Sequence, residues 1–361
     1  MKMKLTSDFK EKLSEGIRSC WTSPSNIALV KYWGKKGHQL PSNPSLSFSL
    51  HEAYTITRIL ATLNTEGQGP LVNFIFEGEK KESFAAKIVD FLKDLTPYFE
   101  YLPYVNLSIE SGNNFPHSAG IASSASAMSA LALSLLTIEQ QLSQEQMDES
   151  ALKQKASFIA RLGSGSACRS VYGGYTVWGK TDEFEGSSDE YAIPAGIITG
   201  QLFNNIKDTI LLVDLHEKKV SSRAGHSLMT GHPYANARYE QANANLSKIK
   251  LALMKNDWNL FTEVVENEAL SLHAMMMSSK PGYLLMHPNT IRIVELIWQI
   301  REQNNLKVCF TIDAGPNIHL LYPDSESEKV IPLIEELKNY CYQGKYISDR
   351  IGKGPENKYC K

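Results

Sequence analysis

Residues 113–127, NNFPHSAGIASSASA, run from a polar loop through small residues directly into an Ala- and Ser-rich segment. Residues 124–140 hold strong helix formers and no Gly or Pro, which predicts a buried helix. A loop that enters a helix presents free N–H groups and the positive end of the helix dipole, so it favours an anion. The stretch therefore predicts a phosphate site, where Gly120 permits close backbone approach and Ser123 and Ser124 donate hydroxyls or hold magnesium. An N-cap serine before a core helix explains the same residues equally well.

The segments around this stretch predict an α+β protein. Residues 18–109 are mostly strand-like, with period-2 alternation at 45–50 and 105–109 and one helix at about 80–95. A second helix is expected to end at Gly163, before a strand at 172–178. The later part predicts a strand at 209–215, three helices between 232 and 303, strands at 307–312 and 318–322, and a last helix at 327–340. The chain of 361 residues is longer than a single hydrophobic core usually accommodates, so two domains are expected. The Gly-, Ser- and Pro-containing segment 182–200 predicts a boundary between domains 1–195 and 196–361.

Composition excludes several classes of function. The formal net charge of -2 and the pI near 6.5 give no global reason to bind nucleic acid or an anionic membrane. The five cysteines are widely spread and form no CxxC pair, which indicates reduced thiols rather than disulfides or a zinc site. Neither a signal-peptide core nor an apolar run of bilayer length occurs, so we expect a cytoplasmic protein without membrane partners.

A second polar cluster, GSGSACRS at residues 163–170, places Arg169 in a flexible, hydroxyl-rich loop. An arginine supported in this way can hold a carboxylate or phosphate with two hydrogen bonds. The competing explanation is a helix C-cap glycine followed by a turn, with Arg169 in a surface ion pair. Neither GxxxxGK[ST] nor GxGxxG occurs, so a nucleotide would not be bound by those loops.

Two strand ends carry further candidates. In residues 23–35, SPSNIALVKYWGK, Lys31 and Lys35 flank an aromatic pair after an apolar run; lysine stems lying along a strand end are the alternative. In residues 310–317, FTIDAGPN, Asp313 follows a strand and enters a Gly-Pro turn. That carboxylate is either a turn former or an acid/base, and the sequence alone leaves both open.

Together these segments resemble the diphosphomevalonate decarboxylases of the GHMP kinase superfamily over about residues 21–322. The resemblance rests on five motifs in order: NIALVKYWGK (26–35), LPSNPSLS (40–47), NNFPHSAGIASSAS (113–126), GSGSACRSVYGG (163–174) and TIDAGPN (311–317). It implies the two-domain GHMP kinase fold, with an N-terminal domain like ribosomal protein S5 domain 2 and a ferredoxin-like C-terminal domain. It also implies ATP- and Mg²⁺-dependent decarboxylation of mevalonate 5-diphosphate to isopentenyl diphosphate, with release of ADP, phosphate and CO2, in isoprenoid biosynthesis.

The resemblance further implies a role for each matching residue. Asp313 would be the acid/base at the substrate hydroxyl, Arg169 would hold the substrate carboxylate, and Lys31 would stabilise charge near the transferred phosphoryl group. The remaining substrate contacts would come from Tyr32, Lys35, Ser164 and Ser166. ATP would contact Asn113, Ser118, Gly120, Ala122, Ser123 and Ser124, and Ser124 would also hold Mg²⁺.

Several positions depart from the family pattern. His117-Ser118 stands in place of Thr-Ala, and Pro44 replaces a usual Ser, which removes a hydroxyl and an N–H. A packing or solvent-facing role is favoured for His117 over a pH-dependent one. In residues 218–226, KKVSSRAGH, Arg223 is either a substrate contact or a surface ion pair. His273, followed by three methionines, is expected to pack within a helix.

Three functions compete at this point. The decarboxylase of mevalonate 5-diphosphate competes with a related decarboxylase or 3-kinase that acts on mevalonate 5-phosphate or mevalonate. Asp313 favours a decarboxylase, because enzymes that only phosphorylate the 3-position are expected to lack this aspartate. A non-catalytic ligand-binding descendant is the third, and it has no reason to hold Asp313, Arg169, Lys31 and the serine loop together. The expected partner is a small anionic phosphorylated substrate, and relatives suggest a homodimer.

Overall fold

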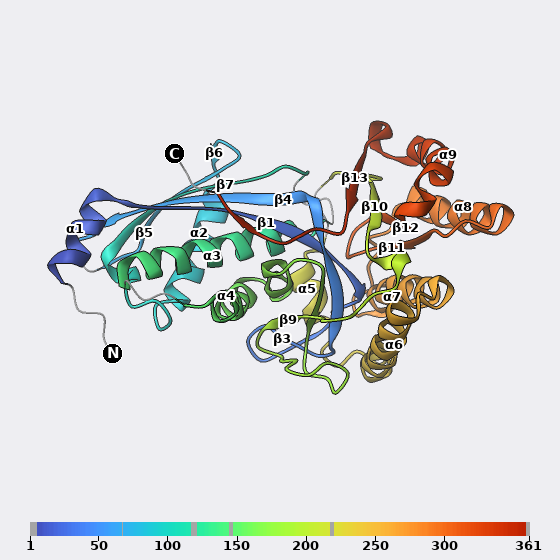
Figure 1. The fold of residues 1–361 in the computed structure, drawn as a ribbon, viewed down its shortest axis with the longest axis horizontal. Coiled ribbons are helices and arrows are strands. Elements are labelled where there is room, and N and C mark those ends of the chain that lie inside the picture. Colours follow the sequence, from blue (N-terminus) through green and yellow to red (C-terminus); the bar gives the residue numbers. More distant parts are fainter. Residues whose placement is uncertain (1–5, 67, 117–120, 144–146, 217–219, 359–361) are drawn as a thin grey trace.

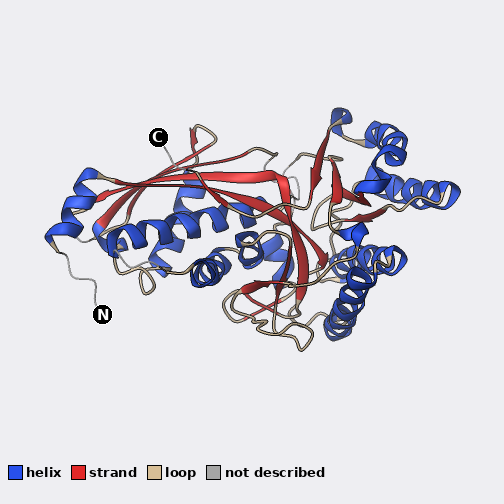
Figure 2. Cartoon of the chain, in the orientation of Figure 1, coloured by secondary structure: helices blue, strands red, loops and turns tan. Residues whose placement is uncertain are grey.

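The computed structural model describes residues 6–66, 68–116, 121–143, 147–216 and 220–358. In these ranges an eight-stranded sheet occupies one part of an elongated molecule and a four-stranded sheet the other (Figure 1). A short hairpin of β2 (Lys35–Lys36) and β3 (Leu40–Pro41) lies apart from both sheets. Helices form a layer beneath the larger sheet and a second group around the smaller one (Figure 2).

The larger sheet is built on two long antiparallel strands, β1 (Ile17–Val30) and β4 (Ser45–Leu63). The sheet order is β14-β1-β4-β7-β5-β6, and β8 and β9 extend it from the start of β4. The predicted alternating segments at 45–50 and 105–109 are confirmed as parts of β4 and of β7 (Val105–Asn113). The other strands are β5 (Leu71–Phe76), β6 (Glu79–Lys80), β8 (Tyr175–Trp178), β9 (Ala192–Pro194) and β14 (Glu356–Asn357).

The helix that begins at the small-residue stretch is the centre of the larger core. This helix, α3 (Ser123–Ser143), packs against β1, β4 and α4 (Glu149–Gly163). Its leucines 131, 133, 135 and 136 are buried, and each contributes about 1.5–3 kcal/mol as an upper limit. The predicted helices at 80–95 and 124–140, and the one ending at Gly163, are confirmed as α2 (Glu82–Asp94), α3 and α4. The sequence did not predict α1 (Ser7–Glu15), which Thr6 caps.

The smaller sheet has the order β11-β12-β10-β13 and is antiparallel throughout. Its strands are β10 (Ile206–Leu211), β11 (Cys309–Thr311), β12 (Ile318–Pro323) and β13 (Tyr346–Arg350). The helices are α5 (Ser222–Ser227), α6 (Ala235–Lys255), α7 (Trp258–Ser278), α8 (Pro288–Asn304) and α9 (Ser327–Leu337). The three helices expected between 232 and 303, the strands near 309 and 318 and the last helix are confirmed. Strand β13 and α5 were not predicted.

The two sheets meet at the bend of β4, and this junction positions the site (Figure 1). Asp349 of β13 accepts hydrogen bonds at 2.8–2.9 Å from the backbone N–H groups of residues 51, 52 and 53. Strand β14 then returns to the larger sheet and pairs with β1. Lys31 directly follows β1 at this junction and lies close to Asp313, which follows β11. The division of the chain at residues 195 and 196 stays a prediction.

Candidate functional site

An ion pair between residues far apart in the sequence lies at the sheet junction. Lys31 directly follows β1 and Asp313 lies two residues beyond β11, yet the Lys31 Nζ is 2.7 Å from Asp313 Oδ1. The Lys31 side chain is 2% exposed and that of Asp313 is 24% exposed. The alternative of a lysine stem lying along a strand end is therefore wrong for Lys31. The carboxylate remains within reach of a ligand.

Each partner of this ion pair opposes the cost of burying the other. Burial lowers the pKa of Lys31, and the carboxylates of Asp313 and Glu268 counteract that effect. Burial alone would raise the pKa of Asp313, but the charge and hydrogen bond of Lys31 hold that pKa below its ordinary value. His319 and Arg169 act on Asp313 in the same direction as Lys31. An ionised carboxylate thus stands beside an ammonium group, ready to accept a proton or to orient a hydroxyl.

Arg169 lies in the 3₁₀ turn Gly165–Val171 after α4, and it is buried rather than on the surface. Its Nε donates to Asn26 Oδ1 at 3.1 Å and its NH1 donates to Ser45 Oγ at 2.8 Å. Both acceptors are neutral, and within the described ranges no carboxylate forms a salt bridge with this guanidinium. The alternative of a surface ion pair is therefore wrong. A buried cation held by neutral oxygens favours an anionic ligand.

Other predicted substrate contacts surround this arginine. The Tyr32 hydroxyl is buried without a hydrogen-bond partner among the described residues, and burial raises its pKa, so it stays a proton donor. It lies against Gly165, where an added Cβ would be 2.9 Å from the hydroxyl oxygen. Ser164 Oγ is 3.3 Å from Ser124 Oγ, which connects this turn to the start of α3. Ser166 is half-buried in the same turn.

Lys35 and Arg223 lie close enough for the charge of one to act on the other. Burial, and then the charge of Arg223, lowers the pKa of Lys35 to about 8. Arg223 is exposed on α5, and no carboxylate of the described part of the chain forms a salt bridge with it. The structure thus shows no surface ion pair for Arg223. Two like charges side by side favour a multiply charged anion.

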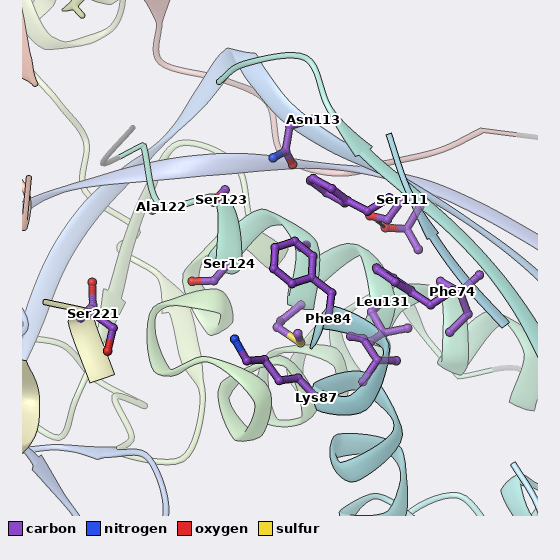
Figure 3. A pocket seen from close by; sticks show the side chains of 17 residues that line it. Phe74, Phe84, Lys87, Ser111, Asn113, Ala122, Ser123, Ser124, Leu131 and Ser221 are labelled. Atoms are coloured by element: carbon purple, nitrogen blue, oxygen red, sulfur yellow. Dashed lines mark hydrogen bonds between the residues drawn. The ribbon is translucent and has the colours of Figure 1, made fainter. Parts of the chain in front are cut away.

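A pocket of about 350 Å³ opens at the start of α3 (Figure 3). Its wall is mostly apolar, and Phe84 of α2 meets Phe76 edge to face at a centroid distance of 5.3 Å. Lys87 extends from α2 toward the Ser124 end (Figure 3). The lining residues are Thr57, Phe74, Phe76, Phe84, Lys87, Ile88, Ile109, Ser111, Asn113, Ala122, Ser123, Ser124, Ala127, Met128, Leu131, Ser221 and Ser222.

This pocket fits a nucleotide. Its apolar part matches a base, and its polar end coincides with the N-terminus of α3, where phosphates are favoured. Asn113 Oδ1 accepts from the Thr55 hydroxyl at 2.7 Å, whereas its Nδ2 is buried without a partner among the described residues. Ala122 has a φ of 48°, which turns the chain into α3. Ser118 and Gly120, and the neighbouring His117, lie outside the described residues.

A magnesium site would depend on the same end of the pocket. Ser124 is exposed there and offers one hydroxyl. In the described part of the chain no three His, Cys, Asp or Glu side chains cluster as metal ligands. Mg²⁺ is commonly held by phosphate oxygens, waters and one or two protein oxygens, so Ser124 suits this arrangement.

Among the described helices, none is long and apolar enough to cross a bilayer.

The sequence did not identify several residues that the structure brings to the site. Asn26 and Ser45 were recognised within motifs but given no role, although both hold Arg169. Glu268 is fully buried and accepts the backbone N–H of Lys31 at 2.7 Å. Its position on the apolar face of α7, in register with Phe261 and Leu272, was the available signal. His273 is buried in α7 as predicted, and it also contacts the Asp313 carbonyl oxygen through Nε2 at 3.1 Å.

Comparisons with known proteins cover nearly the whole chain. Residues 23–192 match the family model "Diphosphomevalonate decarboxylase-like N-terminal domain", and residues 209–358 match "Mevalonate 5-diphosphate decarboxylase C-terminal domain". The diphosphomevalonate decarboxylase of Aspergillus fumigatus is 31% identical over 340 residues, which are 89% of this chain and 80% of that protein. The enzyme of Saccharomyces cerevisiae is 29% identical, with coverage of 88% and 80%.

Solved structures agree with these sequence matches. Mevalonate diphosphate decarboxylase from Staphylococcus aureus superposes with a TM-score of 0.81 at 30% identity, covering 96% of this chain and 100% of that one. A structure described as "MDDEF in complex with MVAPP, AMPPCP and Magnesium" gives 0.80 at 27% identity, with coverage of 95% and 99%. The predicted α+β, two-domain GHMP kinase fold is confirmed by these neighbours.

Proposed function

The chain belongs to the diphosphomevalonate decarboxylase family, and on that premise we propose that it converts mevalonate 5-diphosphate to isopentenyl diphosphate, with ATP and Mg²⁺. ADP, phosphate and CO2 are the other products of this reaction. The observation that carries the proposal is the pair of Lys31 and Asp313 at 2.7 Å, beside an arginine whose hydrogen-bond acceptors among the described residues are neutral. The site thus combines a base, Asp313, with two cations. Lys31 serves the phosphoryl group and Arg169 serves the carboxylate.

Asp313 and Lys31 act at the tertiary hydroxyl of the substrate. The Asp313 carboxylate is ionised and partly exposed, so it accepts a hydrogen bond from that hydroxyl and takes its proton. ATP supplies the phosphoryl group that turns the hydroxyl into a leaving group. The Lys31 ammonium lies against Asp313, where it stabilises negative charge on the oxygen and on the phosphoryl group.

Three cationic side chains bind the negatively charged groups of the substrate. Arg169 binds the carboxylate and, because it is held by Asn26 and Ser45, keeps the carboxylate oriented for loss of CO2. Lys35 and Arg223 bind the diphosphate, and the protonated hydroxyl of Tyr32 donates to the same end. Ser164 and Ser166 support the substrate from the turn that carries Arg169.

The nucleotide is assigned to the pocket at α3. Its base lies against the apolar wall near Asn113, and its phosphates lie over Ala122, Ser123 and Ser124. Ser118 and Gly120 are assigned to the phosphates by motif position alone. The hydroxyl of Ser124 would contribute one oxygen ligand to Mg²⁺, which would stabilise the negative charge of the phosphates.

The proposal extends to the organisation of the protein. Residues 1–195 carry the phosphate loop and residues 196–361 form the second domain. A homodimer is proposed from the relatives, and sedimentation analysis tests it. A cytoplasmic location is supported by the cysteines of the described chain, which are buried at positions 20, 168, 309 and 341 and form no disulfide with one another.

Comparison of substrates tests the proposed specificity. Purified protein is incubated with ATP, Mg²⁺ and either mevalonate, its 5-phosphate or its 5-diphosphate, and kcat/KM is measured for each. The paired charges of Lys35 and Arg223 give the highest value with the diphosphate. Preference for the monophosphate would reassign those two residues, and lack of turnover with all three compounds would support the non-catalytic alternative.

A further inference from the structure

The backbone of Lys31 is held from both sides by buried side chains. Its N–H donates to Glu268 Oε2 at 2.7 Å, and its carbonyl oxygen accepts from Asn43 Nδ2 at 3.0 Å. Glu268 belongs to α7, which otherwise packs in the core beside the smaller sheet. The catalytic lysine is thus anchored through its main chain by a helix from the other half of the molecule.

Glu268 is itself fixed by an ion pair that water does not reach. Arg238 of α6 donates through NH1 to Oε1 at 3.1 Å and through NH2 to Oε2, and the two side chains are 1% and 0% exposed. Asn245 donates to Oε1 at 2.7 Å. With the N–H of Lys31, the carboxylate accepts four hydrogen bonds. These four hydrogen bonds restrict the Glu268 carboxylate to one position and orientation.

The same helix reaches the other member of the catalytic pair. His273 follows Glu268 by just over one helical turn, and its Nε2 lies 3.1 Å from the carbonyl oxygen of Asp313. Helix α7 therefore contacts the main chain of Lys31 and of Asp313, although these residues come from different sheets. This contact sets how the two side chains face one another.

Stability alone does not account for a buried ion pair at this place. Replacing such a pair by apolar residues of similar volume is often neutral or stabilising, because two charges no longer lose their hydration. A carboxylate near a buried ammonium does something that an apolar residue cannot do. It accepts the Lys31 N–H, and its negative charge raises the pKa of Lys31, in addition to the larger effect of Asp313.

We propose that Glu268, held by Arg238, is a positioning residue that fixes Lys31 against Asp313 and supplies negative charge behind the Lys31 ammonium. The inference rests on the proposed roles of Lys31 and Asp313. It adds a residue that does not touch the substrate and acts through the lysine.

The variant Glu268→Gln tests this role, with Glu266→Gln as the matched control. Glutamine keeps an oxygen for the Lys31 N–H but removes the charge. Glu266 is also buried in α7 and is paired with Arg301 and Trp298, but it faces α8 instead of Lys31. Two quantities are measured: the pKa of Lys31 Nζ by NMR on the ligand-free protein with ¹³C-labelled lysine, and kcat. Lys31→Arg assigns the resonance.

In Glu268→Gln we expect the pKa of Lys31 to fall and kcat to drop by about 10²-fold, with the KM for ATP unchanged. In Glu266→Gln the Lys31 pKa stays at the wild-type value. An unchanged Lys31 pKa in Glu268→Gln, or a fall of equal size in both variants, would overturn the proposal. If the single variant does not fold, Glu268→Gln/Arg238→Gln leaves no unpaired buried charge and is judged by the same two quantities.

The NMR readout separates this inference from the proposed function. If Lys31→Met retains activity, the assigned role of Lys31 is wrong whatever the behaviour of Glu268. If Lys31→Met is inactive and Glu268→Gln leaves both the pKa and kcat unchanged, only the positioning role fails.

Discussion

Asp313→Asn removes one charge of the ion pair between Lys31 and Asp313 and keeps the size and shape of the side chain. Loss of an acid/base group at the reacting atoms lowers kcat by about 10²- to 10⁴-fold. ATP is assigned to the α3 pocket under the proposal, and Asp313 does not line that pocket, so the KM for ATP is expected to stay close to that of the wild type. Steady-state kinetics with saturating substrate give both numbers.

The same substitution leaves the Lys31 ammonium buried without its partner. Breaking a buried pair in this way costs roughly 3–5 kcal/mol, and the lower end applies because the Asp313 side chain is 24% exposed. Without Asp313, burial holds the pKa of Lys31 further below its value in the unfolded chain. The unfolded chain then binds the proton more tightly, so the loss of stability is largest at neutral pH and shrinks as the pH rises toward the unfolded value of about 10.4.

Urea unfolding of the variant at about pH 7 and about pH 9 measures this change. Lys31→Met/Asp313→Asn is the control, since it removes the ammonium as well. The double variant is expected to regain most of the lost stability and to remain inactive. Near-native kcat in Asp313→Asn, or equal losses of stability in the single and double variants at both pH values, would refute the reasoning.

Three further substitutions test other parts of the site. Arg169→Lys replaces a planar fork by a point charge, so kcat/KM should fall on the order of 10²-fold, and a small rise in KM alone would remove the carboxylate role. Phe84→Ala removes an aromatic wall of the nucleotide pocket worth about 1 kcal/mol, so the KM for ATP should rise about fivefold with kcat kept, and an unchanged KM would place the base elsewhere. Burial holds the pKa of His226 well below its ordinary value, so the unfolded chain binds this proton first and stability falls below about pH 6.5, by at most about 1.4 kcal/mol per pH unit. His226→Asn keeps an acceptor for the Gly34 N–H and should flatten that slope. A slope equal to that of the wild type would contradict the assignment.

Local patterns predicted most of the regular structure. The alternation of residues 45–50 marks β4, and the small-residue stretch marks the start of α3 at the polar end of the pocket, because each pattern is contained in one segment. The six-residue α5 was missed, since it is too short for a periodic apolar face. Helix α1 was also missed. An N-cap at Thr6 and two buried apolar residues, Phe9 and Leu13, are sufficient to form this short helix.

The arrangement of the site depends on contacts that no spacing encodes. Lys31 and Asp313 are 282 positions apart, and their resemblance to family motifs, rather than any pattern in the chain, suggested a common site. The burial of Arg169 reversed the expectation for a lone arginine in a turn, because Asn26 and Ser45 supply its hydrogen bonds from distant strands. Glu268 lies on an apolar helical face, where the sequence alone does not explain a carboxylate. Its ion pair with Arg238, visible only in the structure, explains it.

Coupling of phosphoryl transfer to decarboxylation is the central claim, and a single-turnover experiment tests it most directly. Excess protein is mixed with ATP, Mg²⁺ and carboxyl-labelled mevalonate 5-diphosphate, and ADP and labelled CO2 are quantified from the same quenched samples. The arrangement of Asp313, Lys31 and Arg169 predicts equal amounts of ADP and CO2 at completion. ADP formed without CO2 would contradict it and make the protein a 3-kinase.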